Sequence, residues 1–147
     1  HASNWEQPQA FSRATIGGLV RPTDDADRYA LGMAMRRQVL GDKRIDNIKL
    51  TPFNEDFQNF ITRYVWGENW TRTGLCPEMR SVLVMGLMIA MGRWDEFRLH
   101  VKAAFNNGLD VSYIKEVILV SAIYCGVPAA NSAMHHAEDV LREMGKI

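Results

Sequence analysis

From residue 23 onward, start and stop signals for helices divide the sequence into segments whose apolar residues recur at helical spacing. Thr23 to Asp25 can cap a first helix that Gly41 ends, and Thr51-Pro52 opens a second helix that ends near Gly67. The same signals predict four more helices, over residues 77–92, 95–106, 111–125 and 128–144. Because no strand-like alternation persists, the expected fold is all-α, an antiparallel bundle of about six helices.

The second and third of these predicted helices differ in their apolar surfaces. Aromatic and aliphatic residues of the second recur on one face, which predicts that this stripe packs on the core: Phe53, Phe57, Phe60, Ile61 and Tyr64. The third is apolar almost all round, so we expect it to be buried either centrally or at a subunit interface. The last four helices are joined by short connections, which predicts two helical hairpins.

Charge and composition exclude several classes of protein. The 17 basic and 17 acidic residues give no net charge, so no basic surface for nucleic acid is expected. The longest apolar run, near Val82–Met91, is too short to span a membrane. We expect one domain over residues 23–147 after an extended polar arm over residues 1–22. Without a signal peptide or a CxxC pair, Cys76 and Cys125 are expected to be reduced thiols in a cytoplasmic protein.

A few ionisable side chains stand at positions that suit catalysis. His100 lies beside the apolar face of its helix, one turn after Glu96, so a functional imidazole and a structural histidine bonded to Glu96 both remain open. Glu116 begins a very apolar segment and is either half-buried and usable for proton transfer or part of an exposed stripe. The adjacent His135 and His136 point in different directions, so at most one faces inward.

The segment 68–74 has the composition of a loop yet carries Trp70 and Arg72. This predicts that the loop binds a ligand. The alternative is that Trp70 only fills the edge of the core. Glu96 and His100 would give a metal only two ligands, so no metal site is expected. Neither a phosphate-binding loop nor a dinucleotide-binding motif is present, so no nucleotide cofactor is expected.

Three separate segments, in order, resemble the gamma-carboxymuconolactone decarboxylase family of the alkylhydroperoxidase D-like superfamily: Trp66–Leu75, Leu99–Gly108 and Tyr124–Asn131. The stretch 28–41 is also similar to the family's start, and the resemblance extends over about residues 27–145. Disulfide reductases of this superfamily carry a Glu, a CxxC and a His on consecutive helices. Glu116 and His135 stand where that Glu and His would be, whereas Pro128 and Asn131 replace the cysteines. A disulfide-dependent peroxidase activity is therefore not expected.

The resemblance implies a homo-oligomer, a hexamer or trimer, and a cofactor-free carboxy-lyase acting on a dicarboxylate lactone. The reaction would convert gamma-carboxymuconolactone to beta-ketoadipate enol-lactone and CO2 in aromatic (protocatechuate) catabolism. Two alternatives are a relative acting on another small carboxylate or lactone, and a non-catalytic redox partner of alkylhydroperoxidase D type. The implied reaction assigns proton transfer or carbonyl stabilisation to His100, Glu116 and His135. It assigns substrate binding to Arg72, Trp70 and Arg80.

Overall fold

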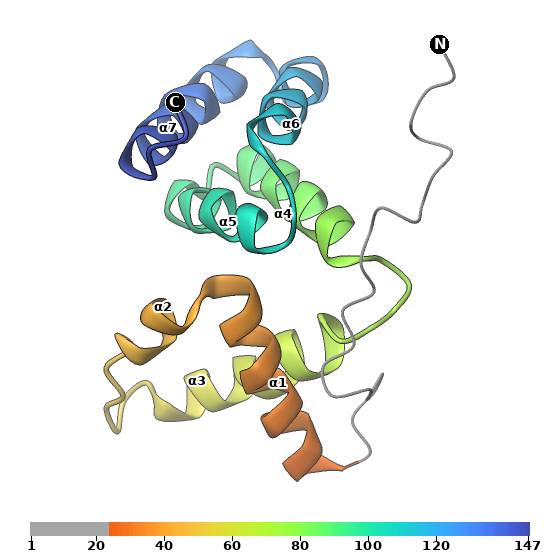
Figure 1. Ribbon diagram of the computed structural model, residues 1–147, viewed down its shortest axis with the longest axis vertical. Helices are drawn as coiled ribbons and strands as arrows, with labels where there is room; N and C mark the ends of the chain where they lie inside the picture. Colours follow the sequence, from red (N-terminus) through yellow and green to blue (C-terminus); the bar gives the residue numbers. More distant parts are fainter. Residues whose placement is uncertain (1–23) are drawn as a thin grey trace.

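The computed structural model describes residues 24–147, and this part of the chain folds into helices without a strand (Figure 1). The all-α prediction is therefore confirmed, while the arm expected over residues 1–22 lies outside the described residues. In chain order the elements are α1 (Asp25–Leu40), α2 (Asp42–Asp46), α3 (Glu55–Ile61), the π-helix η3 (Thr62–Asn69), α4 (Pro77–Met91), α5 (Trp94–Asn106), α6 (Val111–Tyr124) and α7 (Val127–Glu143).

The helices form two groups, with α1, α2, α3 and η3 in one and α4 to α7 in the other (Figure 1). In the second group α4 packs on α5 and α6 on α7, as expected for two helical hairpins. The larger core lies between these four helices and includes Met85, Phe97, Val101, Ile114 and Val140. Because α5 also contacts α1, it joins the two groups.

The boundary between the two groups has a small core of its own, made by Met35, Val39, Trp66, Trp70 and Ala103. Beside it, Asn106 Nδ2 of α5 donates a hydrogen bond of 2.9 Å to the carbonyl oxygen of Val39 in α1. This bond uses one of the carbonyls that the end of α1 leaves without a helical partner. Two of the candidate functional residues, Trp70 and His100, lie at this same boundary.

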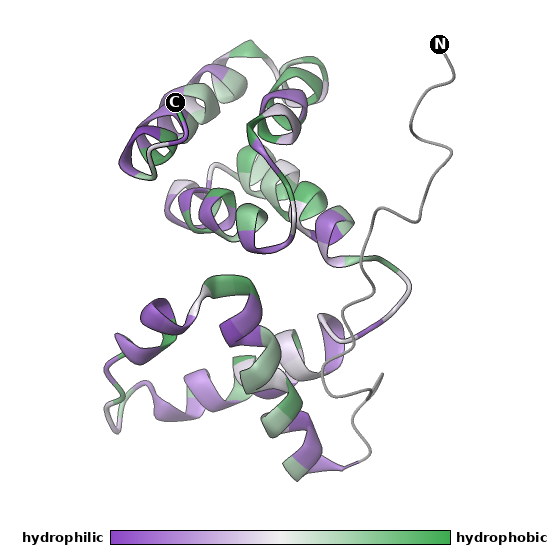
Figure 2. Ribbon diagram, viewed as in Figure 1, coloured by the Kyte–Doolittle hydropathy of each residue, from purple (hydrophilic) through white to green (hydrophobic). Residues whose placement is uncertain are grey.

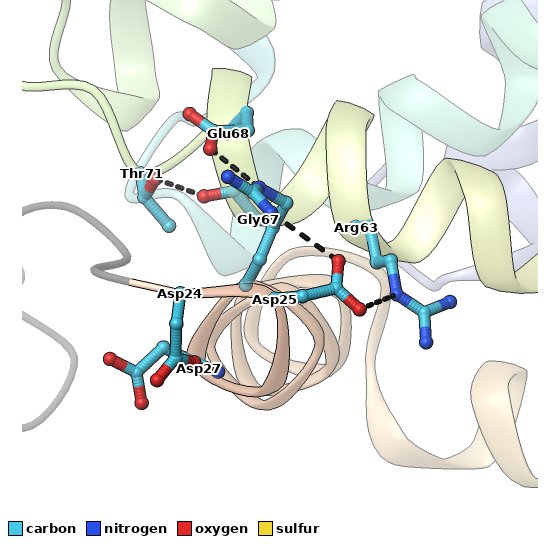
Figure 3. A network of polar contacts seen from close by, with 8 residues as sticks. Asp24, Asp25, Asp27, Arg63, Gly67, Glu68 and Thr71 are labelled. Atoms are coloured by element: carbon cyan, nitrogen blue, oxygen red, sulfur yellow. Dashed lines mark hydrogen bonds and ion pairs between the residues drawn. The ribbon is translucent and has the colours of Figure 1, made fainter.

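The first group depends on a very close approach of α1 to η3. Gly32 and Gly67 lie where the two backbones meet, and a Cβ atom on Gly32 would lie only 2.9 Å from the Gly67 nitrogen. Two ion pairs flank the contact: Arg28 Nε to Glu68 at 2.6 Å, and Arg63 Nε to Asp25 at 3.2 Å (Figure 3). The glycines therefore set the distance between the two helices, and the ion pairs lie at its polar edge.

The segment predicted as one helix over residues 51–67 differs from the expectation. It begins later, at Glu55, and from Thr62 it continues as a π-helix to Asn69. The aromatic stripe does not face the core, since Phe53 is 98% exposed and Phe57 is 61% exposed. Instead, α1 covers the face of η3 that carries Thr62, Trp66 and Gly67. The short α2 was not predicted, because five residues are too few for a periodic pattern.

The apolar helix α4 is buried on one side only. Met85 and Ile89 lie in the core, whereas five other large apolar side chains are exposed: Met79, Val82, Leu83, Leu87 and Met91. Figure 2 shows α4 mainly in the colour of hydrophobic residues, in contrast to α2. No helix within residues 24–147 has the length and hydropathy needed to cross a membrane.

Candidate active site

His100 lies on α5 at the boundary between the two groups of helices. Its imidazole is stacked near the indole of Trp70, with ring centroids 6.3 Å apart and planes 13° apart. Trp70 is itself only 6% exposed and stacks on Trp66 at 5.1 Å. One side of the imidazole thus faces a two-layer aromatic wall supplied by η3 and the residue that follows it. Both sequence interpretations of Trp70 therefore hold, because it fills the edge of the core and also lines the site.

Burial controls the charge of His100. Removal from water lowers its pKa to about 4, against a smaller opposite effect of the nearby Glu96 carboxylate. The imidazole is therefore neutral at physiological pH. Its Nδ1 atom is buried and has no hydrogen-bond partner among the described residues. Glu96 is exposed and does not bond to His100, so the interpretation of a histidine satisfied by that carboxylate is not supported. A buried ring nitrogen without a partner is a feature of binding and catalytic sites.

Arg80 of α4 holds the loop that follows η3. Its guanidinium donates to Asn69 Oδ1 at 3.2 Å and to the carbonyl oxygens of Arg72 and Leu75 at 3.0 and 3.2 Å. The same group lies 6.0 Å from the centre of the Trp70 ring. Burial, and then the proximity of Arg72, lower its pKa from the usual range. Because three acceptors already use the guanidinium, Arg80 acts mainly by positioning Trp70 and the loop.

Arg72 is the more accessible of the two arginines. Its side chain is exposed and makes no hydrogen bond or ion pair with another described residue. Its charge is close enough to Arg80 to affect that residue's pKa. Arg80 of α4 therefore has its donors occupied, whereas Arg72 in the loop has donors available for an anionic ligand.

Glu116 and His135 are not brought to His100 within a single chain. Glu116 is exposed on α6, as are its neighbours Ser112 and Lys115, so the exposed-stripe interpretation describes its surroundings. His135 is also exposed, whereas the adjacent His136 is half-buried and stacks on Trp94 at 5.1 Å. Only one of the two adjacent histidines thus faces inward, as their spacing requires.

Several buried polar residues near the start of α4 were missed by sequence reasoning. Asn107 Nδ2 donates to Ser81 Oγ at 2.8 Å, while Asn107 Oδ1 and Glu78 Oε2 are buried without a hydrogen-bond partner among the described residues. Trp66 and Asn69 were missed as well, although the four-residue spacing of Trp66 and Trp70 was a usable signal.

Within residues 24–147, no three candidate ligands lie close enough together to hold a metal ion.

Taken as a site, a neutral buried imidazole, an aromatic wall and two arginines suit a small anionic substrate whose reaction develops negative charge. The Carboxymuconolactone decarboxylase family matches residues 55–139, which is more than half of the chain and includes all six candidate residues. The chain belongs to this family.

Individual relatives agree with this assignment. Over 124 residues the chain is 45% identical to 4-carboxymuconolactone decarboxylase of Acinetobacter baylyi, with 83% of this chain and 92% of the relative covered. Over 115 residues it is 37% identical to nitrosuccinic acid decarboxylase npaB of Metarhizium robertsii, covering 77% and 80%. A 4-carboxymuconolactone decarboxylase from Pseudomonas putida is 47% identical over 47 residues, which is 31% of this chain and 98% of that sequence.

The lowered pKa of His100 predicts a pH dependence of stability. Between about pH 6.5 and pH 4 the unfolded chain binds a proton at this residue, whereas the folded chain does not. The stability contribution of His100 should therefore fall by up to roughly 3 kcal/mol as pH decreases through this window. Urea unfolding of wild type and His100→Gln at pH 7.5, 5.5 and 4.5 measures it. The variant should gain stability relative to wild type at the lower pH, and a difference independent of pH would contradict the burial argument.

Proposed function

We propose that the protein is a decarboxylase that converts 4-carboxymuconolactone (gamma-carboxymuconolactone) to beta-ketoadipate enol-lactone and CO2. The observation that carries the proposal is the neutral, half-buried His100 stacked near Trp70, whose ring lies 6.0 Å from the Arg80 guanidinium. It is supported by 45% identity to a bacterial 4-carboxymuconolactone decarboxylase over most of both chains. The free thiols Cys76 and Cys125 suit a cytoplasmic enzyme, and the zero net charge offers no reason to propose a nucleic-acid partner.

The reaction is compatible with catalysis by side chains alone. The carboxylate that leaves is bonded to a ring carbon conjugated, through the ring double bond, to the lactone carbonyl. When the C–C bond breaks, its electron pair moves to that carbonyl and produces a dienolate and CO2. A proton added at the carbon next to the carbonyl then gives the product. The enzyme must bind a dianion, stabilise negative charge on the carbonyl oxygen and deliver one proton.

His100 fits the second of these tasks. A neutral imidazole retains one N–H, which can donate to the developing oxyanion in a site that largely excludes water. A well-placed donor of this kind contributes about 3–4 kcal/mol to transition-state stabilisation. Because the imidazole is neutral beforehand, it does not form a fixed ion pair that would favour the substrate over the transition state. Trp70 stacks near the imidazole and supports it from one side.

Arg72 is assigned to a substrate carboxylate, since its donors are unused and a guanidinium matches a carboxylate bidentately. We expect Arg72→Ala to raise KM about tenfold or more with a much smaller change in kcat, because the contact is made equally in substrate and transition state. Steady-state kinetics measure this, with the exposed Arg93→Ala as the matched control. A fall in kcat at unchanged KM would assign Arg72 a different role.

The proposed activity is tested by following the ultraviolet absorbance of the lactone while measuring CO2 release. One CO2 should appear for each lactone consumed, without added metal or nucleotide. Consumption of lactone without CO2 would overturn the proposal. No consumption at all would favour the second candidate below.

A decarboxylase acting on a nitro acid is the second candidate, because the chain is 37% identical to nitrosuccinic acid decarboxylase npaB. A nitro group, like a lactone carbonyl, accepts the electron pair that a departing carboxylate leaves. Comparing kcat/KM for both substrates separates the candidates. For the redox-partner alternative, a thiol titration would have to show a redox-active disulfide involving the exposed Cys125.

A homo-oligomer, in keeping with a hexamer or trimer, is part of the proposal. We propose that a second copy of the chain packs on the exposed apolar residues of α6, which are Leu119, Val120, Ile123 and Tyr124. These side chains are far more exposed than is usual in a monomer. Glu116 precedes Leu119, Val120 and Ile123 by three, four and seven residues, so all lie on one face of α6. A copy packed there would remove Glu116 from water, which is the condition for the proton-relay role. His135 stays a weaker candidate of the same kind.

The oligomer is tested with Ile123→Glu, which places a charge at a side chain that is 79% exposed in the single chain. The variant should fold, since this side chain contributes little to the core, but its mass in solution should fall relative to wild type. Light scattering after size exclusion measures this. The matched control is Lys115→Glu, a charge change on the same helix. A wild-type monomer, or an unchanged mass for Ile123→Glu, would contradict the assignment of this face.

A further inference from the structure

A groove of about 680 Å³ lies between α2 and α5, and no role has been given to it above. The volume is within the range of pockets that bind small organic molecules. The lining residues come from the end of α1, from α2 and the residue after it, and from one face of α5: Leu40, Lys43, Arg44, Asn47, Asp95, Arg98, Leu99 and Lys102.

The lining is strongly unbalanced in charge. Four side chains are cationic and only Asp95 is acidic, although the whole chain has no net charge. On the α5 side, Arg98 and Lys102 are partly neutralised, because both form ion pairs with Glu143 at 3.1 and 3.2 Å. On the α2 side, the side chains of Lys43 and Arg44 make no hydrogen bond or ion pair with any other residue in the range 24–147. The groove thus has two cations without a counter-charge facing two that are already paired.

The groove is separate from the His100 site although both use α5. In a helix each residue turns the side-chain direction by about 100°. Ala103 marks the face of α5 that contacts α1. To one side of this face lie Arg98, Leu99 and Lys102, and to the other side lies His100. The hydrogen bond from Asn106 to Val39 closes the boundary between α1 and α5 beyond Ala103. An anion in the groove would thus lie on the opposite flank of α5 from His100.

We propose that the groove between α2 and α5 binds a small organic dianion, with its charges near Lys43 and Arg44 and its carbon chain on Leu40 and Leu99. The two cationic side chains without a partner favour a ligand with two negative charges. The two leucines at the same surface favour a molecule with an apolar part over an inorganic ion. Asn47 adds an uncharged donor and acceptor at the α2 side. The inference does not depend on the decarboxylase assignment, because it concerns binding on the opposite flank of α5.

Isothermal titration at pH 7 and constant ionic strength tests the proposal, with glutarate as the dicarboxylate, butyrate as the monocarboxylate and inorganic phosphate as the ion without a carbon chain. Glutarate should bind at least tenfold more tightly than either of the others. The variant Lys43→Gln/Arg44→Gln should weaken glutarate binding at least tenfold. The matched variant Lys49→Gln/Arg93→Gln, which removes one exposed lysine and one exposed arginine outside the groove, should change it less than twofold.

Two further measurements keep the result unambiguous. The single variants Lys43→Gln and Arg44→Gln should each weaken binding by an intermediate factor, and thermal unfolding checks that every variant is folded. Glutarate affinity that survives Lys43→Gln/Arg44→Gln, or that phosphate equals, would overturn the proposal, as would the absence of binding to wild type.

Discussion

His100→Ala is expected to lower kcat for the decarboxylation at least a hundredfold while the chain stays folded. The imidazole is the one buried, neutral group in the described site that has an unused nitrogen and a flat aromatic partner. Loss of a donor to a developing oxyanion lowers rates by about 10²–10³. Single-turnover measurement of CO2 release separates the chemical step from product release.

The control for this variant is His136→Ala, which removes a half-buried histidine stacked on Trp94. It should keep kcat within about threefold of wild type, because its imidazole belongs to the packing between α5 and α7. Near-normal turnover of His100→Ala would remove His100 from the mechanism. Equal losses in both variants would show that the effect comes from packing and not from chemistry.

Gly32→Ala is expected to have the largest effect on stability. A methyl group at this position would overlap the carbonyl oxygen of Thr62 and approach the Gly67 nitrogen to 2.9 Å, and both obstacles are backbone atoms that cannot rotate away. Relief requires α1 and η3 to separate along their most extensive contact. The cost should exceed about 4 kcal/mol, which corresponds to a melting temperature lower by roughly 10 °C or more.

Thermal unfolding followed by circular dichroism measures the effect, and Ala30→Ser is the matched control because it adds one atom to an exposed position of the same helix. That control should stay within about 0.5 kcal/mol of wild type. Because the contact also supports Trp66 and Trp70, any folded Gly32→Ala protein should have reduced activity as well. A melting temperature close to that of wild type would show that α1 and η3 can move apart at little cost.

Most of the fold was accessible from local signals in the sequence. Asp24 caps α1 by accepting from the Asp27 amide at 2.8 Å, and Asp110 caps α6 by accepting from the Ser112 amide at 2.8 Å. Gly41 has a positive φ of 88° where α1 was expected to end. Such caps depend on a few neighbouring residues, so sequence alone reveals them.

The aromatic stripe of α3 shows where this reasoning failed. Spacing indicates that Phe53, Phe57 and Phe60 share a face, but it does not indicate which element covers that face. In the structure the close contact of Gly32 with Gly67 brings α1 onto a different face of the segment. A change from α- to π-helical bonding after Ile61 is equally invisible to a pattern that assumes one constant period.

The candidate site was partly predictable. The loop tryptophan and the histidine on α5 do meet, and Arg80 was recognised as a residue of interest although its three hydrogen bonds were not. Whether His100 and Glu116 come together depends on the relative orientation of α5 and α6, which no local pattern contains. Within one chain Glu116 is exposed, so its role depends on contacts that lie outside a single copy.

The π-helical segment makes the geometry beside His100 sensitive to chain length as well as to residue type. In η3 the Trp70 amide donates to the Val65 carbonyl at 3.0 Å, a bond that spans five residues in place of the usual four. Loss of one residue between Thr62 and Asn69 would remove this five-residue bond and shift the indole of Trp70 relative to the imidazole. Natural variation in this segment should therefore consist of exchanges at constant length, whereas the loop after Trp70 can absorb insertions only as far as Arg80 continues to reach it.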